Sequence, residues 1–226
     1  SFAGVPNSSI DFTTGVTTAI LMENAAKSYT FYDDFDQTAI TGWSTSLSGG
    51  TINIQQTGPV PGNHIGQLRF QTSNLNDRAT LLRTANANTI FFGNGEAMVE
   101  FAVYLENLSD ATNEYELYLG FGDGTTGNPT DGAFIRYVRT SSANWGIGAS
   151  TGGTATVTNS SVPVVATTWL GLRVVVNAAG NSAEFFIGNS GNGSFTSLGT
   201  VTTNIPTLVA NICTPFVRVN RTAGTV

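Results

Sequence analysis

The chain has 226 residues, of which 40% are hydrophobic and only 11% are charged, with a net charge of −6 at pH 7. A domain of this length buries roughly 70–75% of the surface of its unfolded chain, so its core needs no disulfide or metal staple. Nine basic against fifteen acidic residues give no sequence-independent attraction for nucleic acid or for an anionic membrane surface, which argues against both as partners.

The polar residues are mainly threonine, asparagine, serine and 26 glycines, which suit pleated strands and the turns between them. Cys213 is the single cysteine, so no internal disulfide can form, and its apolar neighbours predict a small buried hydrophobe. No run of about 18 apolar residues is available for insertion into a bilayer. The first six residues lack the charged and apolar regions of a signal peptide, so we expect synthesis in a host cytoplasm without export.

Residues 1–28 differ in character from the rest of the chain. They contain two short segments of extended character and one helix-forming stretch, 21–27, which is too short to be stable by itself. We interpret residues 1–28 as an N-terminal arm that packs on the domain or on a neighbouring subunit. A partly ordered terminus is the alternative, and the sequence leaves both open.

Residues 29–226 repeat the order strand, turn, strand. Polar and apolar positions alternate most clearly over 97–106, as in a half-buried strand. No window of 12 residues or more has the helical period, and no internal repeat is present. The sequence therefore predicts an all-β sandwich or barrel of antiparallel strands rather than a parallel α/β fold. In chain order the strand candidates are 28–35, the segment at Trp43, 51–56, 67–71, 79–83, 97–106, 114–121, 133–139, 145–149, 154–158, 169–176, 183–187 and 216–219.

Short motifs follow one another in a recognisable order. They are Tyr-Asp-Asp-Phe-Asp at 32–36 before Trp43, the strand at 167–176, its hairpin partner at 183–188, and a polar linker ending in Ile-Pro at 205–206. Together they resemble the concanavalin A-like lectin/glucanase (laminin-G-like) superfamily. The resemblance spans about residues 29–220 and implies a two-sheet antiparallel jelly-roll sandwich, a fold that hosts lectins, glycosidases and structural modules alike.

The end of the chain departs from that superfamily in one respect. Its members usually close with a strand that pairs beside the first one, whereas this chain stops at residue 226. Two explanations remain open, namely that residues 216–219 form the closing strand or that the chain has been trimmed.

Glu114, Glu116 and Tyr118 are the nearest approach to a catalytic motif. Retaining glucanases of the superfamily place three acidic residues at alternate positions of one strand, with nucleophile and acid about 5–5.5 Å apart. Here a tyrosine stands at the third position. His64 is the only histidine and lacks a nucleophile-elbow pattern nearby, so it gives no support for a catalytic triad. We predict that the protein is not an enzyme, and a glycoside hydrolase ranks last among our hypotheses.

The loop over residues 121–132 is the best candidate for a ligand site. Asp123, Asn128 and Asp131 offer hard oxygen ligands, and neighbouring glycines let carbonyls turn inward, as Ca²⁺ requires. In lectins of the similar fold such loops bind Ca²⁺ and sugar hydroxyls, and Trp145 would supply an aromatic ring to stack on the sugar. The alternative is that these residues simply form a long turn.

The leading hypothesis for function is a non-enzymatic structural or adhesion protein of a tailed-bacteriophage particle. The composition of the chain, rich in glycine, threonine and asparagine and poor in lysine, resembles that of such virion proteins. We expect a tail fibre, receptor-binding or head-decoration module, located in the virion, that forms a homo-oligomer and contacts other virion proteins and a cell-surface glycan. The alternative is a carbohydrate-binding lectin domain of a bacterial adhesin.

Overall fold

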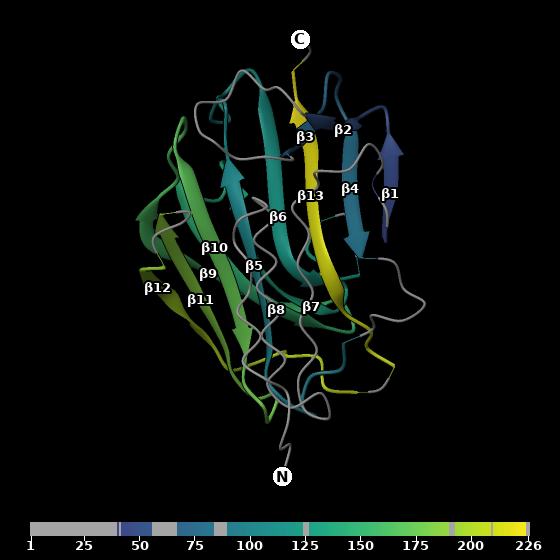
Figure 1. Ribbon diagram of the computed structural model, residues 1–226. Coiled ribbons are helices and arrows are strands. Elements are labelled where there is room, and N and C mark those ends of the chain that lie inside the picture. The colour runs from purple at the N-terminus through teal and green to yellow at the C-terminus, as the bar shows by residue number, and fades with distance from the viewer. Residues whose placement is uncertain are drawn as a thin grey trace, which may run out of the picture. The chain divides into compact units, whose positions relative to one another are not determined.

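The computed structural model describes residues 40, 42–55, 67–83, 90–123, 127–189, 193–208 and 210–224 (Figure 1). The chain divides into two units, Ser1–Asp33 and Asp34–Val226, and all the described residues belong to the second unit. The predicted arm at 1–28, the strand candidate at 28–35 and His64 lie outside the described residues.

The described residues form thirteen strands, and no helix among them has the length and hydropathy to cross a membrane. The strands are β1 (Trp43–Ser48), β2 (Thr51–Gln55), β3 (Gln67–Gln71), β4 (Arg78–Arg83), β5 (Ala97–Tyr104), β6 (Glu114–Gly122), β7 (Gly132–Val138), β8 (Asn144–Thr151), β9 (Thr154–Pro163), β10 (Trp169–Val176), β11 (Ala183–Asn189), β12 (Phe195–Val201) and β13 (Thr214–Ala223).

These strands form a seven-stranded sheet, a four-stranded sheet and one hairpin. The seven-stranded sheet has the order β1-β4-β13-β6-β7-β8-β9, the four-stranded sheet has the order β12-β11-β10-β5, and β2 pairs with β3. Every pairing between these strands is antiparallel. The predicted all-β architecture of two antiparallel sheets is confirmed. The strand predicted at 216–219 is the middle of β13, which lies between β4 and β6 in the seven-stranded sheet.

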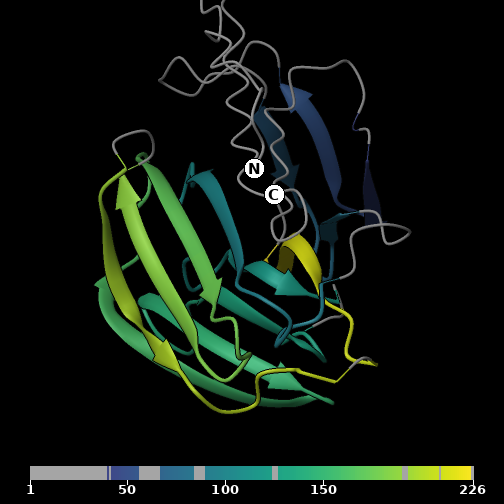
Figure 2. The same ribbon diagram turned by 60° about the horizontal axis from the view of Figure 1, so that its bottom comes forward.

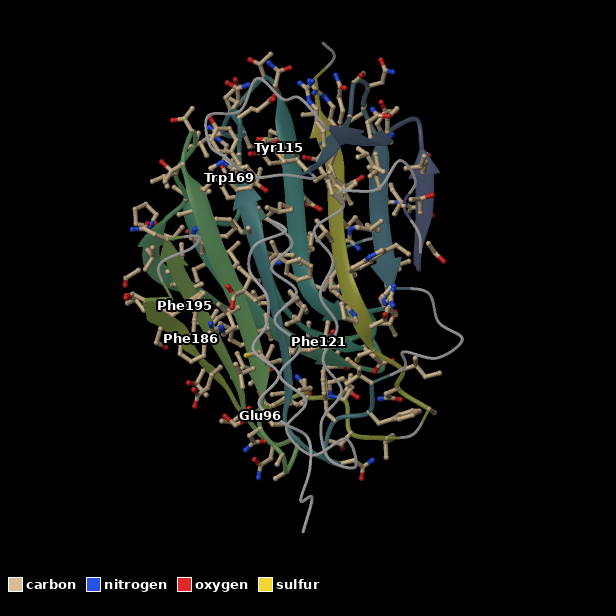
Figure 3. All side chains as sticks on the ribbon, viewed as in Figure 1. Glu96, Tyr115, Phe121, Trp169, Phe186 and Phe195 are labelled. Carbon is tan, nitrogen blue, oxygen red and sulfur yellow. The ribbon has the colours of Figure 1, made fainter. Side chains whose placement is uncertain are left out.

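The main hydrophobic core lies between the two larger sheets, which Figure 2 shows as separate layers. Alternate side chains of β6, β7 and β8 enter it from one side, and those of β10 and β11 enter it from the other. Leu119, Ile135 and Leu172 are fully buried there. Phe121 also lies in this core, edge-on to Phe92 with ring centroids 5.4 Å apart (Figure 3). Every second side chain of each of these strands thus faces the core, as the two-residue period of the sequence predicts.

The opposite face of the four-stranded sheet is solvent-facing. Met98 on this face is 59% exposed, and Arg173 Nη2 donates to Glu100 Oε2 at 2.8 Å. The Arg173 guanidinium also lies over the ring of Phe195, 3.8 Å from its centroid. Figure 3 shows Phe195 and its neighbour Phe186 on this sheet. Arg173 is thus partly exposed and contacts both a carboxylate and an aromatic ring.

β12 corrects one prediction, because the sequence assigned residues 189–206 to a polar linker. Phe195–Val201 instead pairs with β11 as the edge strand of the four-stranded sheet. Leu198 and Val201 are buried although they stand three residues apart, so the strand lacks the two-residue period. A register shift against β11, near Gly199 with φ 137°, explains this spacing, since a bulge adds a residue to one strand.

Candidate functional site

The loop between β6 and β7 uses its three predicted oxygen ligands to hold itself in place. The Asp123 carboxylate accepts a hydrogen bond from a backbone N–H of the loop at 3.2 Å. Asn128 Oδ1 accepts one from Arg136 Nη1 at 3.1 Å, and Asp131 Oδ1 accepts one from the Gly152 N–H at 2.8 Å. The three side chains therefore bond to three different segments of the domain.

This arrangement fits Ca²⁺ poorly. The oxygen of Asn128 faces the Arg136 guanidinium, which would repel a cation at that position. In the described ranges of the chain, no group of three or more acidic, histidine or cysteine side chains is placed to hold a metal. The hydrogen bonds support the alternative interpretation, in which these residues form a long turn.

Trp145 corrects a second prediction, because its ring is not available to stack on a sugar. Its side chain is fully buried in the core between the sheets, with its ring centroid 6.3 Å from that of Tyr137. Trp145 shares its parity on β8 with Ile147 and Ala149, which are buried as well. The two-residue period of β8 therefore already placed this ring on the core side.

Glu114, Glu116 and Tyr118 do share one face of the seven-stranded sheet, because they alternate along β6. Glu114 Oε1 accepts a hydrogen bond from Arg139 Nη1 at 3.1 Å in an ion pair, and 18% of its side chain is exposed. Tyr118 is 2% exposed, and burial raises the pKa of its phenol. The motif thus provides a single carboxylate outside this ion pair, whereas glycoside hydrolysis by such enzymes needs two.

A second buried layer lies on that same face, away from the core between the sheets. Two of its aromatic side chains, Phe134 and Phe216, are fully buried. The signal in the sequence was that β7 is apolar at every position except Arg136, because a strand covered on both faces does not alternate. The layer consists of Tyr118, Phe134, Val138 and Phe216, with Leu82 and Val157 packed against them.

Glycines make room for both rings of this layer. A Cβ at Gly148 would lie 2.9 Å from ring atoms of Phe134, and a Cβ at Gly122 would lie 2.7 Å from a ring atom of Phe216. Real Cβ atoms do not approach other atoms so closely, so the rings rest against bare backbone. The glycines are therefore part of the packing of this face.

A polar row crosses four strands beside the rings. Arg218 of β13 is opposite Thr80 on one side and opposite Tyr118 on the other, and Tyr118 is opposite Arg136. The Arg218 guanidinium lies 4.4 Å from the centroid of the Tyr118 ring. Neighbouring residues in such a row have Cβ atoms about 4.5–5.5 Å apart, so the row is continuous. We call this side of the sheet the arginine face and define it by Arg78, Thr80, Glu116, Tyr118, Phe134, Arg136, Phe216 and Arg218.

Arg218 is fully buried, and much of its hydrogen-bonding capacity is unused. Its Nη2 donates to the Gly127 carbonyl, but within the described part of the chain Nε and Nη1 have no acceptor. The hydroxyl of Thr80, also fully buried, and the Nε atoms of Arg78 and Arg136 likewise lack a partner there. A buried polar group without a partner costs about 1–3 kcal/mol, and a charged group costs more. The arginine face therefore concentrates unmet donors.

The charges on this face are unbalanced. Burial lowers the pKa of the Arg218 guanidinium, and Arg78 lowers it further, while Tyr118, Glu116 and Asp123 oppose the shift. An arginine nevertheless stays protonated in a protein. The ion pairs among the described residues do not include Arg78, Arg136 or Arg218. Three guanidinium groups thus stand against two carboxylates, those of Glu116 and, in the neighbouring loop, Asp123.

Comparison with solved structures supports the fold. The chain is similar to a protein of unknown function, SO2946, from Shewanella oneidensis MR-1, with a TM-score of 0.54 and 15% identity over 86% of this chain and 84% of that one. It is also similar to a Lotus tetragonolobus seed lectin, with a TM-score of 0.47 and 8% identity over 84% and 89% of the two chains. A third similar structure is a β-glucanase from Bacillus licheniformis, with a TM-score of 0.41 and 15% identity over 86% and 85%. The likeness to SO2946 agrees with the antiparallel β-sandwich described above.

Comparison of sequences identifies the family. No curated protein matches the chain. The family model described as SO2946-like, C-terminal domain, matches residues 63–226, a stretch that includes every residue of the arginine face. The chain therefore belongs to the SO2946-like C-terminal domain family.

Proposed function

We propose that this domain is a non-enzymatic adhesion module that binds its ligand on the arginine face. One observation carries the proposal: the half-buried arginines Arg78 and Arg136 lie on one face of the seven-stranded sheet, and neither has an ion-pair partner among the described residues. A ligand that brings acceptor oxygens to this face would give these charges a partner.

The geometry of the carboxylates supports binding over hydrolysis. Glu114 is held in its ion pair with Arg139, and a tyrosine occupies the third position of the glucanase-like motif. Glu100 and Glu106, on or next to β5, are paired with Arg173 and Arg69 in the same way. A second free carboxylate opposite Glu116 would be needed for acid and base roles.

The setting that we propose is the surface of a tailed-bacteriophage particle, where the domain would serve as a tail fibre, receptor-binding or head-decoration module. Low charge and a composition rich in threonine and asparagine support this setting. A homo-oligomer that contacts other virion proteins follows from it. The alternative is a lectin domain of a bacterial adhesin, which would use the same face. Labelling of native particles with an antibody to the domain distinguishes the two, since an adhesin would leave particles unlabelled.

The binding proposal is tested with the full chain on a glycan panel and on whole bacterial cells. Arg136→Ala removes a half-buried arginine of the proposed face, and Arg173→Ala is the control on the other sheet. We expect Arg136→Ala to weaken binding at least about tenfold, as loss of a charged contact of 1.5 kcal/mol or more would. Equal binding by both variants, or release of reducing sugars from the panel, would overturn the proposal.

A further inference from the structure

We infer that two copies of this chain pair through the free edge of β9, antiparallel and around a two-fold axis. The inference rests on the homo-oligomer of the proposed function and adds the surface at which the copies meet. Its basis is the lack of charged residues on and around β9, the direction of the backbone groups of this strand, and the contrast with the other edge strands of the two larger sheets.

One side of the sandwich is built from sequence without charge. Residues 140–172 and 185–217 contain no aspartate, glutamate, lysine or arginine, and they include all of β8, β9 and β12. The strands β9 and β12 are the edges of their sheets on that side, where Thr156 Oγ1 lies 2.8 Å from Thr203 Oγ1 (Figure 1). Two copies with a net charge of −6 repel each other. They meet at the lowest cost through a surface without charges, because like charges brought together in an interface weaken it.

The turn before β9 fixes which of its backbone groups point outward. Two glycines with φ values of 54° and 81° form a two-residue turn between β8 and β9. In such a hairpin the pair next to the turn is hydrogen-bonded, and so is every second pair after it. Thr154 and every second residue after it therefore bond to β8, whereas the N–H and C=O groups of Ala155, Val157 and Asn159 point away from it. The strand is accessible to a partner there, because Thr158 and Asn159 are exposed and no other described strand pairs with β9.

The outward groups of β9 match a second copy of themselves. With the two-fold axis beside Val157, this residue faces its own copy, and Ala155 faces Asn159 of the other chain. All three residues point their N–H and C=O groups outward, so about six hydrogen bonds can form between the two strands. On the side toward the core, Thr156 faces Thr158 of the other chain, and threonine pairs stabilise neighbouring strands. The dimer joins two seven-stranded sheets into one and presents both arginine faces on the same side.

The other edges of the two larger sheets suit self-pairing less well. β5 carries Glu100 among its outward residues, and a charge on an edge strand hinders pairing with another edge. β12 pairs with β11 through a register shift, and a bulge of this kind also protects an edge. β1 lies against β4, which has Arg78 and Arg83 at its two ends. In contrast, β9 pairs with β8 in regular register over Thr154–Asn159, and β8 has no charged residue.

The first test is the mass of the full chain in solution. Sedimentation equilibrium from about 1 to 200 µM covers the affinities typical of small interfaces, to which the pairing of one strand with another belongs. We expect a monomer–dimer equilibrium with a dissociation constant in the micromolar range. Arg136→Ala, the variant that tests ligand binding, should leave this equilibrium unchanged, since Arg136 lies two strands away from β9.

Paired substitutions on β9 then test the surface and its register. Ala155→Lys/Asn159→Lys and Ala155→Glu/Asn159→Glu each set like charges opposite each other at both ends of the proposed contact. Each variant alone should raise the dissociation constant at least about 30-fold. An equal mixture of the two sets lysine opposite glutamate and should recover a dimer with one chain of each kind. Thr196→Lys/Thr200→Lys, at exposed positions of β12, adds the same charge elsewhere and should not weaken the dimer.

The outcomes separate this inference from the proposed function. If the unmodified chain is monomeric at the highest concentration, the inference and the homo-oligomer are both wrong, whereas ligand binding on the arginine face is decided by Arg136→Ala alone. If the chain dimerises and both β9 variants still do so, the copies meet at another surface and the assignment to β9 is wrong. If the mixture of folded variants fails to recover the dimer, or if the β12 variant loses it as well, the antiparallel pairing of β9 is refuted.

Discussion

The faces that the two sheets turn away from the shared core both carry arginine beside aromatic rings, but in opposite circumstances. On the four-stranded sheet, Arg173 lies over Phe195, with 28% of its side chain exposed, and pairs with Glu100 at 2.8 Å. On the seven-stranded sheet, Arg218 lies over Tyr118, is fully buried, and has two nitrogens without a partner among the described residues. The same side chain is thus satisfied on one sheet and unsatisfied on the other.

The difference shows that the composition of a strand determines whether its outward residues are exposed or buried. β5 alternates half-buried and largely exposed residues, so its outward positions stay in water. β7 is apolar at nearly every position, so its outward positions are packed into a second layer. An arginine placed in that layer loses its hydration, and only a partner of opposite charge fully replaces it.

The largest effect that tests this comparison is expected from removal of a ring. Phe134→Ala leaves a cavity in the fully buried layer of the arginine face and should lower the free energy of unfolding by about 3–5 kcal/mol. Phe195→Ala, on the half-exposed face of the other sheet, should cost much less, about 1 kcal/mol. Urea unfolding measures both. Equal losses would show that the two faces do not differ in burial.

A second test concerns the two arginines of β13, Arg218 and Arg221. Arg221→Met breaks contacts to three oxygen acceptors and should lower the free energy of unfolding by about 2–4 kcal/mol. Arg218→Met removes a buried charge that has no ion-pair partner in the described residues, so without ligand we expect a change within about 1 kcal/mol of zero. A loss above 3 kcal/mol for Arg218→Met would mean that its charge is already compensated within the protein.

A smaller effect is expected for the exposed ion pair. A double-mutant cycle with Arg173→Ala and Glu100→Ala should give a coupling energy of about 0.2–1 kcal/mol, because both side chains are partly in water. The coupling should shrink when the salt concentration is raised to 1 M, since exposed charges are screened. A salt-independent coupling above 2 kcal/mol would contradict the solvent-facing description of this sheet.

The smallest effect is expected from chelation. Asp123, Asn128 and Asp131 already accept protein hydrogen bonds, and Asn128 faces the Arg136 guanidinium. Adding a chelator, or millimolar Ca²⁺ after chelation, should therefore shift the melting temperature by less than about 1 °C. A clear rise with Ca²⁺, lost in Asp131→Asn, would restore the metal site that the sequence suggested.

The arginine face could not be predicted from the sequence, although most of the strands could. The period of two located β6, β7, β8 and β10 within a residue or two, and on β8 the same period places Trp145 on the core side. The interpretation of Trp145 as a ring that stacks on a sugar relied on the likeness to lectins and did not use this two-residue period. β12 was missed for the opposite reason, because a bulge breaks its period and its exposed residues are threonine and serine. Arg78, Arg136 and Arg218 lie 58 and 82 residues apart along the chain, so no local pattern joins them.

The sequence by itself determined the class of the fold, the parity of each regular strand, and the burial of Cys213, because these follow from the local alternation of apolar and polar side chains. Only the tertiary structure decided which strands lie side by side, since antiparallel pairing between β4, β13, β6 and β7 depends on contacts far apart in the chain. That order brings three arginines and a threonine onto one face. It also decided that Arg218 and Thr80 are buried on this face, where they lose the water to which such polar side chains would otherwise bond.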